Sequence, residues 1–594
     1  MRLTDCQLGD AYQDDVRSEV IEKLEESGDY WERDGVGGEY LKHVKNLIPM
    51  WPQLELLSDF MGVGTIPTRW QIFPGETDFF DIKRYTYVQN GITDKRVTQR
   101  QRKQRVNVTL LQYSDGEVTE SDPILNAESL LRTAETVKAS NIKASFNLFV
   151  VEDLSSEVIE TLGSTFGIDP RFFRAHIIDY AWNNVRDRWR EPPILDLDAR
   201  KRDWFQLRLI RSRYFSNQEE FGNAKKEIDQ WNVFRRMDAD NNEIFWDKDV
   251  RTQPKRVVNG TVGHIRSRIT FWRQASFGVV LLDPTLRAGY PLWRGYASWY
   301  PFPQFPSHRE LREDLSPIPP SLRRPKPGEA NDRPEDLQGS LFNDFIFWAQ
   351  HTPVSQSSGE SSPCTPCRKP LEVMLRLVCA EWLTFTDYIN TRLNQIDWGI
   401  GNPGFFPDSD SREQSLQKLH FWRRWTSQSV DIFRRNMRQI ENFQKQRQSS
   451  VIKSPFKEDF DSILSYLNGA EQRVTNLGAV VNSAIGLEDA RNTSKLTVLA
   501  SAFVPPSLLA AILSMNTEPL SGIYDALFWW AVLSVAGILT LFGSYYVATR
   551  GRSGQWKGQV RQMAHDGGLR WNAVDNQIRE LAKRRKKADR PGAA

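Results

Sequence analysis

The sequence predicts an α+β soluble region, a long helix that follows it, and two hydrophobic spans near the C-terminus. Three observations predict this class. Short β-branched and aromatic runs alternate with a helix-like segment between residues 144 and 283. Apolar residues then recur every three or four positions from Phe460 to Ala484. Two uncharged runs beyond them are each long enough to cross a bilayer.

Four segments of the sequence predict the α/β region. Residues 146–151, 269–272 and 279–282 resemble strands, and residues 155–166 resemble a helix. We therefore expect residues 136–300 to form a cytosolic α/β domain. Residues 1–135 are expected to be a polar, irregular and variable N-terminal region, with a basic cluster from Lys95 to Arg105.

Prolines and serines dominate residues 301–370, which are expected to be an insertion or linker. Residues 371–455 should be the helical part of the cytosolic domain, with a break at Pro403 and Pro407. A further helix is expected from about residue 456, and its apolar seam predicts a bundle or coiled-coil helix. The seam residues are Phe460, Ile463, Leu467, Ala470, Val474, Leu477, Val481 and Ala484.

The two uncharged runs predict a multi-pass membrane protein, with stalk helix and spans together in residues 456–549. As helices, residues 496–515 would rise about 30 Å and residues 526–549 about 36 Å. The alternative to two membrane spans is a helical hairpin buried within the protein. Lys and Arg flank the pair, whereas the loop between them carries only Glu518 and Asp525. Because Lys and Arg favour the cytoplasmic side, both termini should be cytoplasmic and this acidic loop should lie outside or in a lumen. Which membrane is involved stays open.

Composition and motifs exclude several classes. The chain has a net charge of +3 and a mean hydropathy of −0.53, and its acidic first sixteen residues do not resemble a signal peptide. No nucleophile elbow, phosphate-binding glycine loop or metalloprotease helix occurs, so we do not expect an enzyme. The basic tail, residues 550–594, fits either anionic lipid or solvent, and nucleic acid is not an expected partner.

Two metal-like motifs have simpler interpretations. Cys364 and Cys367 form a pair that no second pair or nearby histidine completes, so they are interpreted as linker sequence without an assigned role. The segment from Asp238 to Asn242 resembles the start of a calcium loop but lacks its glycine and its terminal glutamate spacing. We interpret it as a solvated turn.

The first span carries a small-residue face, defined as the small, hydroxylated or β-branched residues that recur on one side of the helix. Such a face either packs against the second span or lines a pore. Hydroxyl and carbonyl oxygens can hold the water shell of a cation without stripping it, which suits magnesium because magnesium sheds water reluctantly. The face consists of Thr493, Thr497, Ala500, Val504, Ser507, Ala511 and Ser514.

Residues 497–516, TVLASAFVPPSLLAAILSMN, resemble the first transmembrane helix of the CorA superfamily of divalent-cation transporters. Pro505, Met515 and Asn516 match that helix in place, and Ser514 stands where the family usually has Gly. Residues 149–177 resemble a strand-helix segment of the family's cytosolic domain, and residues 266–284 resemble its divergent fungal members. The implied architecture is CorA-like.

The resemblance implies a homopentamer in membrane lipid, with the first span of each copy lining the pore. Asn516 would then present its amide oxygen to a hydrated ion, with Ser514, Met515 and Asn516 at the pore mouth. The implied cargo is a divalent cation, most of all magnesium, and no resident cofactor is expected. A zinc transporter on the same scaffold and a membrane-anchored scaffold or sensor that does not transport stay open as alternatives.

Overall fold

The computed structural model describes residues 38–65, 95–114, 117–139, 146–178, 194–215, 217–233, 235–240, 261–292, 340–351, 368–401, 411–446 and 455–513, and further positions between 528 and 538. The chain divides into two compact units, residues 1–479 and residues 480–594. The first unit contains every strand described below.

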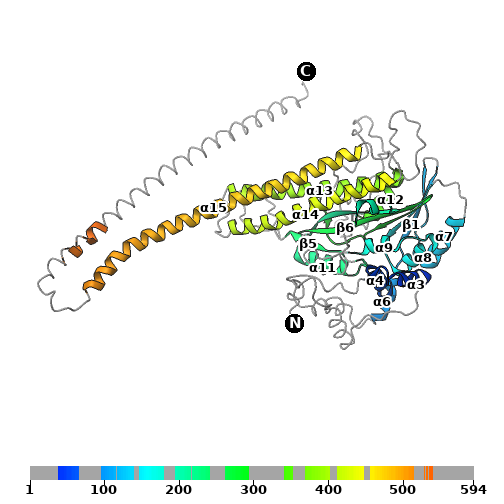
Figure 1. Ribbon diagram of the computed structural model, residues 1–594, viewed down its shortest axis with the longest axis horizontal. Helices are drawn as coiled ribbons and strands as arrows, with labels where there is room; N and C mark the ends of the chain where they lie inside the picture. The colour runs from blue at the N-terminus through cyan, green and yellow to red at the C-terminus, as the bar shows by residue number, and fades with distance from the viewer. Residues whose placement is uncertain are drawn as a thin grey trace, which may run out of the picture. The chain divides into compact units, whose positions relative to one another are not determined.

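An eight-stranded sheet forms the centre of the first unit in the described part of the chain (Figure 1). Its order is β2-β1-β3-β7-β6-β4-β8, and β5 also pairs with β6. Only the β3–β7 pair is parallel among these strands. The strands are β1 (Val108–Ser114), β2 (Glu117–Glu120), β3 (Phe146–Glu152), β4 (Trp204–Phe215), β5 (Met237–Asp240), β6 (Thr261–Gln274), β7 (Phe277–Leu282) and β8 (Tyr290–Pro291).

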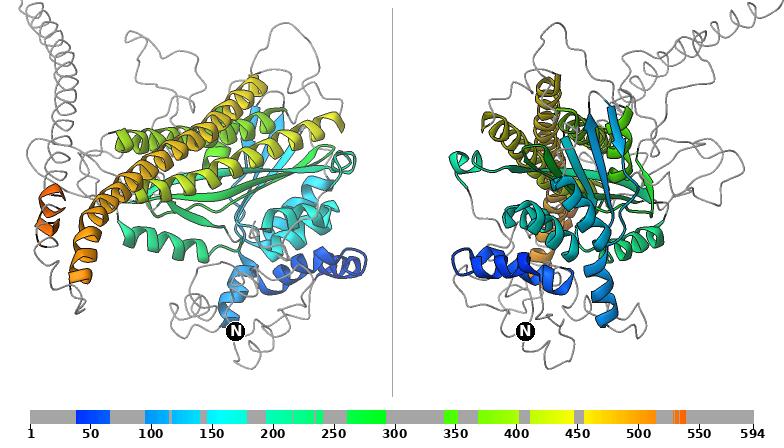
Figure 2. Two further views of the ribbon diagram at one scale, coloured as in Figure 1. Left: turned by 60° about the vertical axis from the view of Figure 1, so that its left-hand side comes forward. Right: turned by 90° about the vertical axis from the view of Figure 1, so that its right-hand side faces the viewer.

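Helices pack on both sides of the sheet (Figure 2). On one side the helices near the N-terminus and around β3 share a core with β1, β3 and β7. They are α3 (Glu39–Leu47), η1 (Pro52–Leu54), α4 (Glu55–Val63), α7 (Ala127–Ala139), α8 (Ser156–Phe166) and α9 (Pro170–Ile177). α6 (Lys95–Gln104) packs beside α8 and α4. The remaining helices are α10 (Asp196–Ala199), α11 (Gln218–Asp229), α12 (Leu341–His351), α13 (Arg368–Gly401), α14 (Ser411–Gln446) and α15 (Pro455–Leu513).

The strands and the helix predicted for residues 144–283 are confirmed as β3, β6, β7 and α8. Local chemistry explains the limits of α8. The Ser155 hydroxyl accepts a hydrogen bond from the Val158 N–H at 3.4 Å and caps the start of the helix. Gly167 ends it at φ 65°, a left-handed conformation that glycine adopts without strain. α9 then begins at once, with Asp169 as its cap and Pro170 as its first residue.

The region before residue 136 differs from the polar and irregular segment that was expected, because α3, α4, β1 and β2 belong to the same fold. The Glu160 carboxylate of α8 accepts hydrogen bonds from the N–H groups of Tyr40 and Leu41 at 2.7 and 3.0 Å, at the start of α3. The Tyr40 hydroxyl donates to the Ile168 carbonyl at 2.6 Å. The Tyr40 ring also lies so close to Gly163 that a Cβ there would be 2.6 Å from the ring. These contacts bind the N-terminal helices to α8.

α14 runs along the free backbone of β4 and supplies side-chain amides to it. The Gln206 N–H donates to Gln439 Oε1 at 2.8 Å, and the Arg208 N–H donates to Asn436 Oδ1 at 2.9 Å. Asn436 Nδ2 returns a hydrogen bond to the Arg208 carbonyl at 2.6 Å, and Trp382 of α13 donates to the same oxygen at 3.1 Å. Hence side chains of α13 and α14 form hydrogen bonds with the backbone of β4, in addition to the apolar packing of these helices on the sheet.

Candidate pore-lining helix and buried polar clusters

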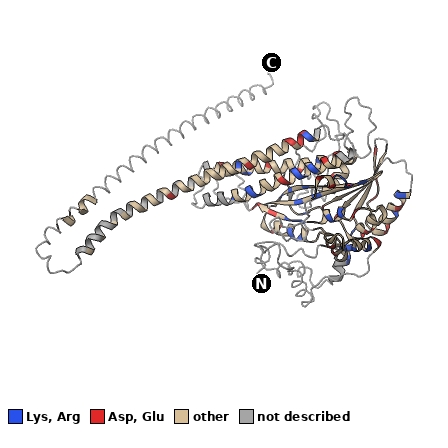
Figure 3. Cartoon of the chain, in the orientation of Figure 1, with Lys and Arg blue, Asp and Glu red and all other residues tan. Residues whose placement is uncertain are grey.

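α15 contains the small-residue face as far as Ala511. Members of that face follow one another at spacings of three and four, so they lie on one side of the helix. The side chains of Thr497, Ala500, Ser507 and Ala511 are all exposed in the single chain. No charged residue occurs in α15 after Lys495. The described residues of this last part are tan in Figure 3. The described side chains of the face are thus uncharged and exposed in the single chain.

The hydroxyl groups on this face bond within the helix. Thr497 Oγ1 donates to the Thr493 carbonyl at 2.8 Å, and Ser507 Oγ donates to the Phe503 carbonyl at 2.6 Å. Each hydroxyl therefore donates to the carbonyl one turn earlier, and a hydroxyl oxygen has acceptor capacity as well.

The helix continues through Pro505 and Pro506. Because proline has no N–H, the carbonyls of Ser501 and Ala502 do not receive the usual helical hydrogen bond. This stretch of α15 consequently combines the exposed Ser507 with two carbonyls that lack the usual helical N–H partner.

The predicted pore mouth, Ser514, Met515 and Asn516, lies outside the described residues, as do Glu518 and Asp525. Only scattered positions of the second hydrophobic run are described. Among the described residues, no helix combines the length and the apolar character needed to cross a membrane.

The apolar seam of α15 packs against helices of its own chain. From Phe460 to Leu477 every seam residue is buried, and Leu467 is completely so. The Phe460 ring lies 5.2 Å from that of Phe433 on α14, and Arg473 forms an ion pair with Asp397 of α13 at 3.3 Å. The seam thus packs α15 into a helical bundle with α13 and α14 of the same chain.

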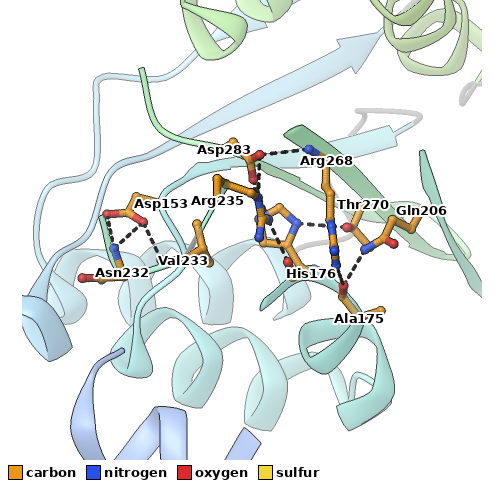
Figure 4. Close-up of polar contacts among 10 residues, drawn as sticks. All are labelled: Asp153, Ala175, His176, Gln206, Asn232, Val233, Arg235, Arg268, Thr270 and Asp283. Atoms are coloured by element: carbon orange, nitrogen blue, oxygen red, sulfur yellow. Dashed lines mark hydrogen bonds and ion pairs between the residues drawn. The ribbon is translucent and has the colours of Figure 1, made fainter. Parts of the chain in front are cut away.

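A buried polar cluster, the Asp283 cluster, joins the end of β7 to α9 (Figure 4). Asp283 accepts two hydrogen bonds from Arg235, both at 2.7 Å, and one from the Arg268 N–H at 2.9 Å. Arg235 also donates to the His176 carbonyl at 2.8 Å, and Arg268 donates to the Ala175 carbonyl at 3.1 Å. Two cations therefore bond the last carbonyls of α9, where the helix dipole favours positive charge.

His176, in the same cluster, lies between an acid and a hydroxyl, an arrangement that resembles a catalytic relay. Its Nδ1 is 3.0 Å from Thr270 Oγ1, and its Nε2 is 3.6 Å from Asp283 Oδ1. All three residues have an exposed fraction of 0%, so no substrate reaches them in this conformation. Burial and the neighbouring Arg235 lower the pKa of His176 to about 3, which keeps the ring neutral at pH 7. The cluster is structural.

Asp153 forms a second buried centre at the end of β3. Its carboxylate accepts hydrogen bonds from the N–H groups of Asn232 and Val233, at 3.0 and 3.3 Å, and from Arg105 at 2.6 Å. Asp153 has a φ of 53°, a left-handed conformation that aspartate tolerates better than most residues. Its side chain thereby fixes the segment between α11 and β5.

The two carboxylates of the calcium-like segment are held by cations of the protein. Asp238 pairs with Arg266 at 3.0 Å, and Asp240 accepts hydrogen bonds from Tyr388 at 2.6 Å and Arg392 at 2.8 Å. Asp240 is buried rather than solvated, which corrects the interpretation of this segment as a solvated turn. In the part of the chain that the structure describes, no group of three metal-binding side chains occurs. Cys364 and Cys367 lie outside that part.

Comparison with known proteins finds a family that the helical part resembles. Residues 366–546 match the family described as CorA-like Mg2+ transporter protein. This region contains α13, α14 and α15, and it is the part of the chain that is similar to the family.

A search of solved structures finds the CorA magnesium transporter of Methanocaldococcus jannaschii, at 10% sequence identity and a TM-score of 0.34. The match covers 73% of this chain and 95% of that one. No match was found among curated proteins.

Proposed function

We propose that the chain forms a channel that carries divalent cations, magnesium above all, across a membrane. The observation that carries this proposal is the family match over residues 366–546, which includes α15 and the Ser514 to Asn516 segment beyond it. The exposed residues of the uncharged face of α15 support the same proposal, because small side chains and neutral oxygen atoms suit a path for a hydrated ion.

Each part of the face has a role in this mechanism. Thr497 and Ser507 offer hydroxyl oxygens to the water shell of the ion, and Ala500, Val504 and Ala511 leave room for that shell. Asn516 binds the hydrated ion at the mouth through its amide oxygen, with Met515 bracing the turn. Glu518 and Asp525 raise the local cation concentration by electrostatic attraction. Magnesium keeps its inner water molecules throughout, since stripping them is unfavourable.

A single α15 cannot enclose a path, and its small-residue face is exposed in the single chain. We therefore propose that several copies, five in this family's arrangement, place this face around a common axis. Residues 496–515 and 526–549 are then the two membrane spans, and both termini lie in the cytoplasm. Membrane lipid covers the outer surface of the spans.

Ser514 favours a second candidate, a zinc transporter on the same scaffold. The usual Gly at this position accepts a positive φ freely, whereas Ser meets steric strain there. A changed turn alters the spacing of the Asn516 amides and with it the cation that they select. A third candidate is a membrane-anchored scaffold or sensor, in which transport has been lost.

Uptake by cells that lack their own magnesium transport tests the proposal. The unchanged protein should restore growth at low magnesium, and Asn516→Ala should abolish this rescue without changing the amount of protein in the membrane. Asn476→Ala is the matched control, because Asn476 is exposed on α15 but lies outside the small-residue face. Zinc flux without magnesium flux would favour the second candidate. Rescue that survives Asn516→Ala refutes the pore assignment.

A further inference from the structure

His264 lies on β6 at the centre of aromatic side chains from α13 and α14. Its exposed fraction is 0%, and its Nδ1 is 3.0 Å from the hydroxyl of Ser212, the residue opposite on β4. The centroid of the His264 ring is 5.2 Å from that of Tyr388 and 5.4 Å from that of Trp425. One polar edge of the imidazole is therefore bonded to the sheet, and aromatic rings surround the remainder.

Four buried polar atoms in this region have no hydrogen-bond partner among the described residues. They are His264 Nε2, Trp422 Nε1, Trp425 Nε1 and Ser429 Oγ. Comparable groups beside them are bonded: Trp382 Nε1 donates to the Arg208 carbonyl at 3.1 Å, and Thr426 Oγ1 donates to the Trp422 carbonyl at 2.8 Å. Within the contact between α14 and the sheet, these four atoms therefore differ from the bonded groups beside them.

The four atoms come from positions that face one another. Trp422, Trp425 and Ser429 are spaced by three and four residues, so they lie on one side of α14. Hydrogen bonds from Asn436 and Gln439 align α14 antiparallel to β4, with Asn436 at Arg208. Seven helical residues rise about 10 Å, and about three strand residues cover the same length. Ser429 is consequently level with Arg211 and Ser212, and Ser212 contacts His264.

We propose that this region is an internal hydration site, in which ordered water binds His264 Nε2 together with the indole N–H groups and the Ser429 hydroxyl. Buried polar groups in folded proteins are almost always bonded, because an unbonded one loses its hydration without compensation. A buried water molecule makes about three hydrogen bonds and supplies what such groups lack.

Water fits this set of groups better than an anion does. The indole N–H groups only donate, whereas the Ser429 hydroxyl donates or accepts and His264 Nε2 does either according to its tautomer. Water complements both tautomers of His264, since it donates and accepts. An anion only accepts, so it requires every group to donate. The site is separate from the small-residue face, and its existence does not depend on ion transport.

A density map of the full-length protein at a resolution that reveals ordered water tests the proposal directly. The expected result is a peak within about 2.7–3.2 Å of His264 Nε2 and of at least one of the two indole nitrogens. Side chains that close on one another with no such peak would overturn the proposal. A peak that bromide replaces, seen by its anomalous signal, would also overturn it, because the occupant would then be an anion.

Thermal unfolding of Ser429→Ala gives an independent measurement. If water bonds the hydroxyl, the substitution removes a hydrogen bond and lowers Tm relative to Ser427→Ala. Ser427 is exposed on the same helix, so this control accounts for the higher helix propensity of alanine. A Tm above that of the control would show that the hydroxyl is unbonded in the native protein and would count against the site. If the two measurements disagree, the density map decides.

Discussion

Replacing Asp283 with asparagine removes one negative charge from the centre of the Asp283 cluster. Asparagine keeps the shape of the side chain and one of its oxygen atoms, but Arg235 then stays buried opposite a neutral amide. Arg235 has an exposed fraction of 1%, so water does not solvate its charge. Removing one partner of such a buried pair costs about 3–5 kcal/mol.

Thermal unfolding of the full-length protein in detergent, followed by tryptophan fluorescence, measures this loss. The unit that contains Asp283 spans residues 1–479, for which 1 kcal/mol corresponds to about 1–2 °C, so Tm should fall by roughly 3–10 °C. Asp238→Asn is the matched control, because its pair with Arg266 has side chains that are 27% and 22% exposed. A pair of this kind contributes about 1 kcal/mol or less. Equal losses in Asp283→Asn and Asp238→Asn would refute the reasoning.

The same pair predicts how acid affects stability. Burial on its own raises the pKa of Asp283, but the Arg235 charge and its hydrogen bonds outweigh burial and hold the pKa below the ordinary value of 3.8. As pH falls, the unfolded chain binds this proton before the folded chain does. The stabilisation is therefore complete above pH 3.8 and is lost as pH falls through the folded pKa. Asp283→Asn should lack this component of the acid-induced decrease in Tm.

Three further predictions concern packing and topology. Leu467→Ala should lower the free energy of unfolding by about 2–5 kcal/mol and leave the oligomer size unchanged in light scattering, since the seam packs within one chain; a smaller oligomer would contradict this. Gly163→Ala places a Cβ against the Tyr40 ring and should speed hydrogen exchange in α3, and unchanged protection would contradict the docking of that helix. Tags before Met1 and after Ala594 should resist a protease added outside sealed cells, and cleavage of either would overturn the orientation.

Apolar periodicity predicted the elements whose buried residues all lie within one continuous segment of the sequence. The Phe146 to Val151 run became β3, and the three-and-four spacing from Phe460 onward became α15, because each element buries its own continuous apolar face. The N-terminal helices were missed because α3 and α4 are each nine residues long, which is too short for apolar periodicity to be recognised. α3 depends on Glu160, about 120 residues away, for the hydrogen bonds at its start.

The Asp283 cluster was missed for a related reason. Arg235 lies 48 residues from Asp283, and His176 lies 94 residues from Thr270, so no local spacing relates them. One signal was present: Asp283 follows directly after the four-residue apolar run that ends β7. An acid at the end of a buried strand needs a partner, and a cation elsewhere in the chain was to be expected. The helix that carries the small-residue face as far as Ala511 was predictable, since it depends only on helical spacing.

The side-chain amides of α14 that bond the backbone of β4 also determine whether another extended chain can pair with this strand. A strand with an open backbone is a template for another extended chain, and many peptide-binding domains capture ligands in that way. The N–H groups of Gln206 and Arg208 already donate to the side chains of Gln439 and Asn436, so they are not available to another strand. A chain whose Asn436 and Gln439 are replaced by leucine would still favour a helix at α14, yet it would leave those backbone groups without partners. During overexpression such a chain should deposit as β-rich aggregate.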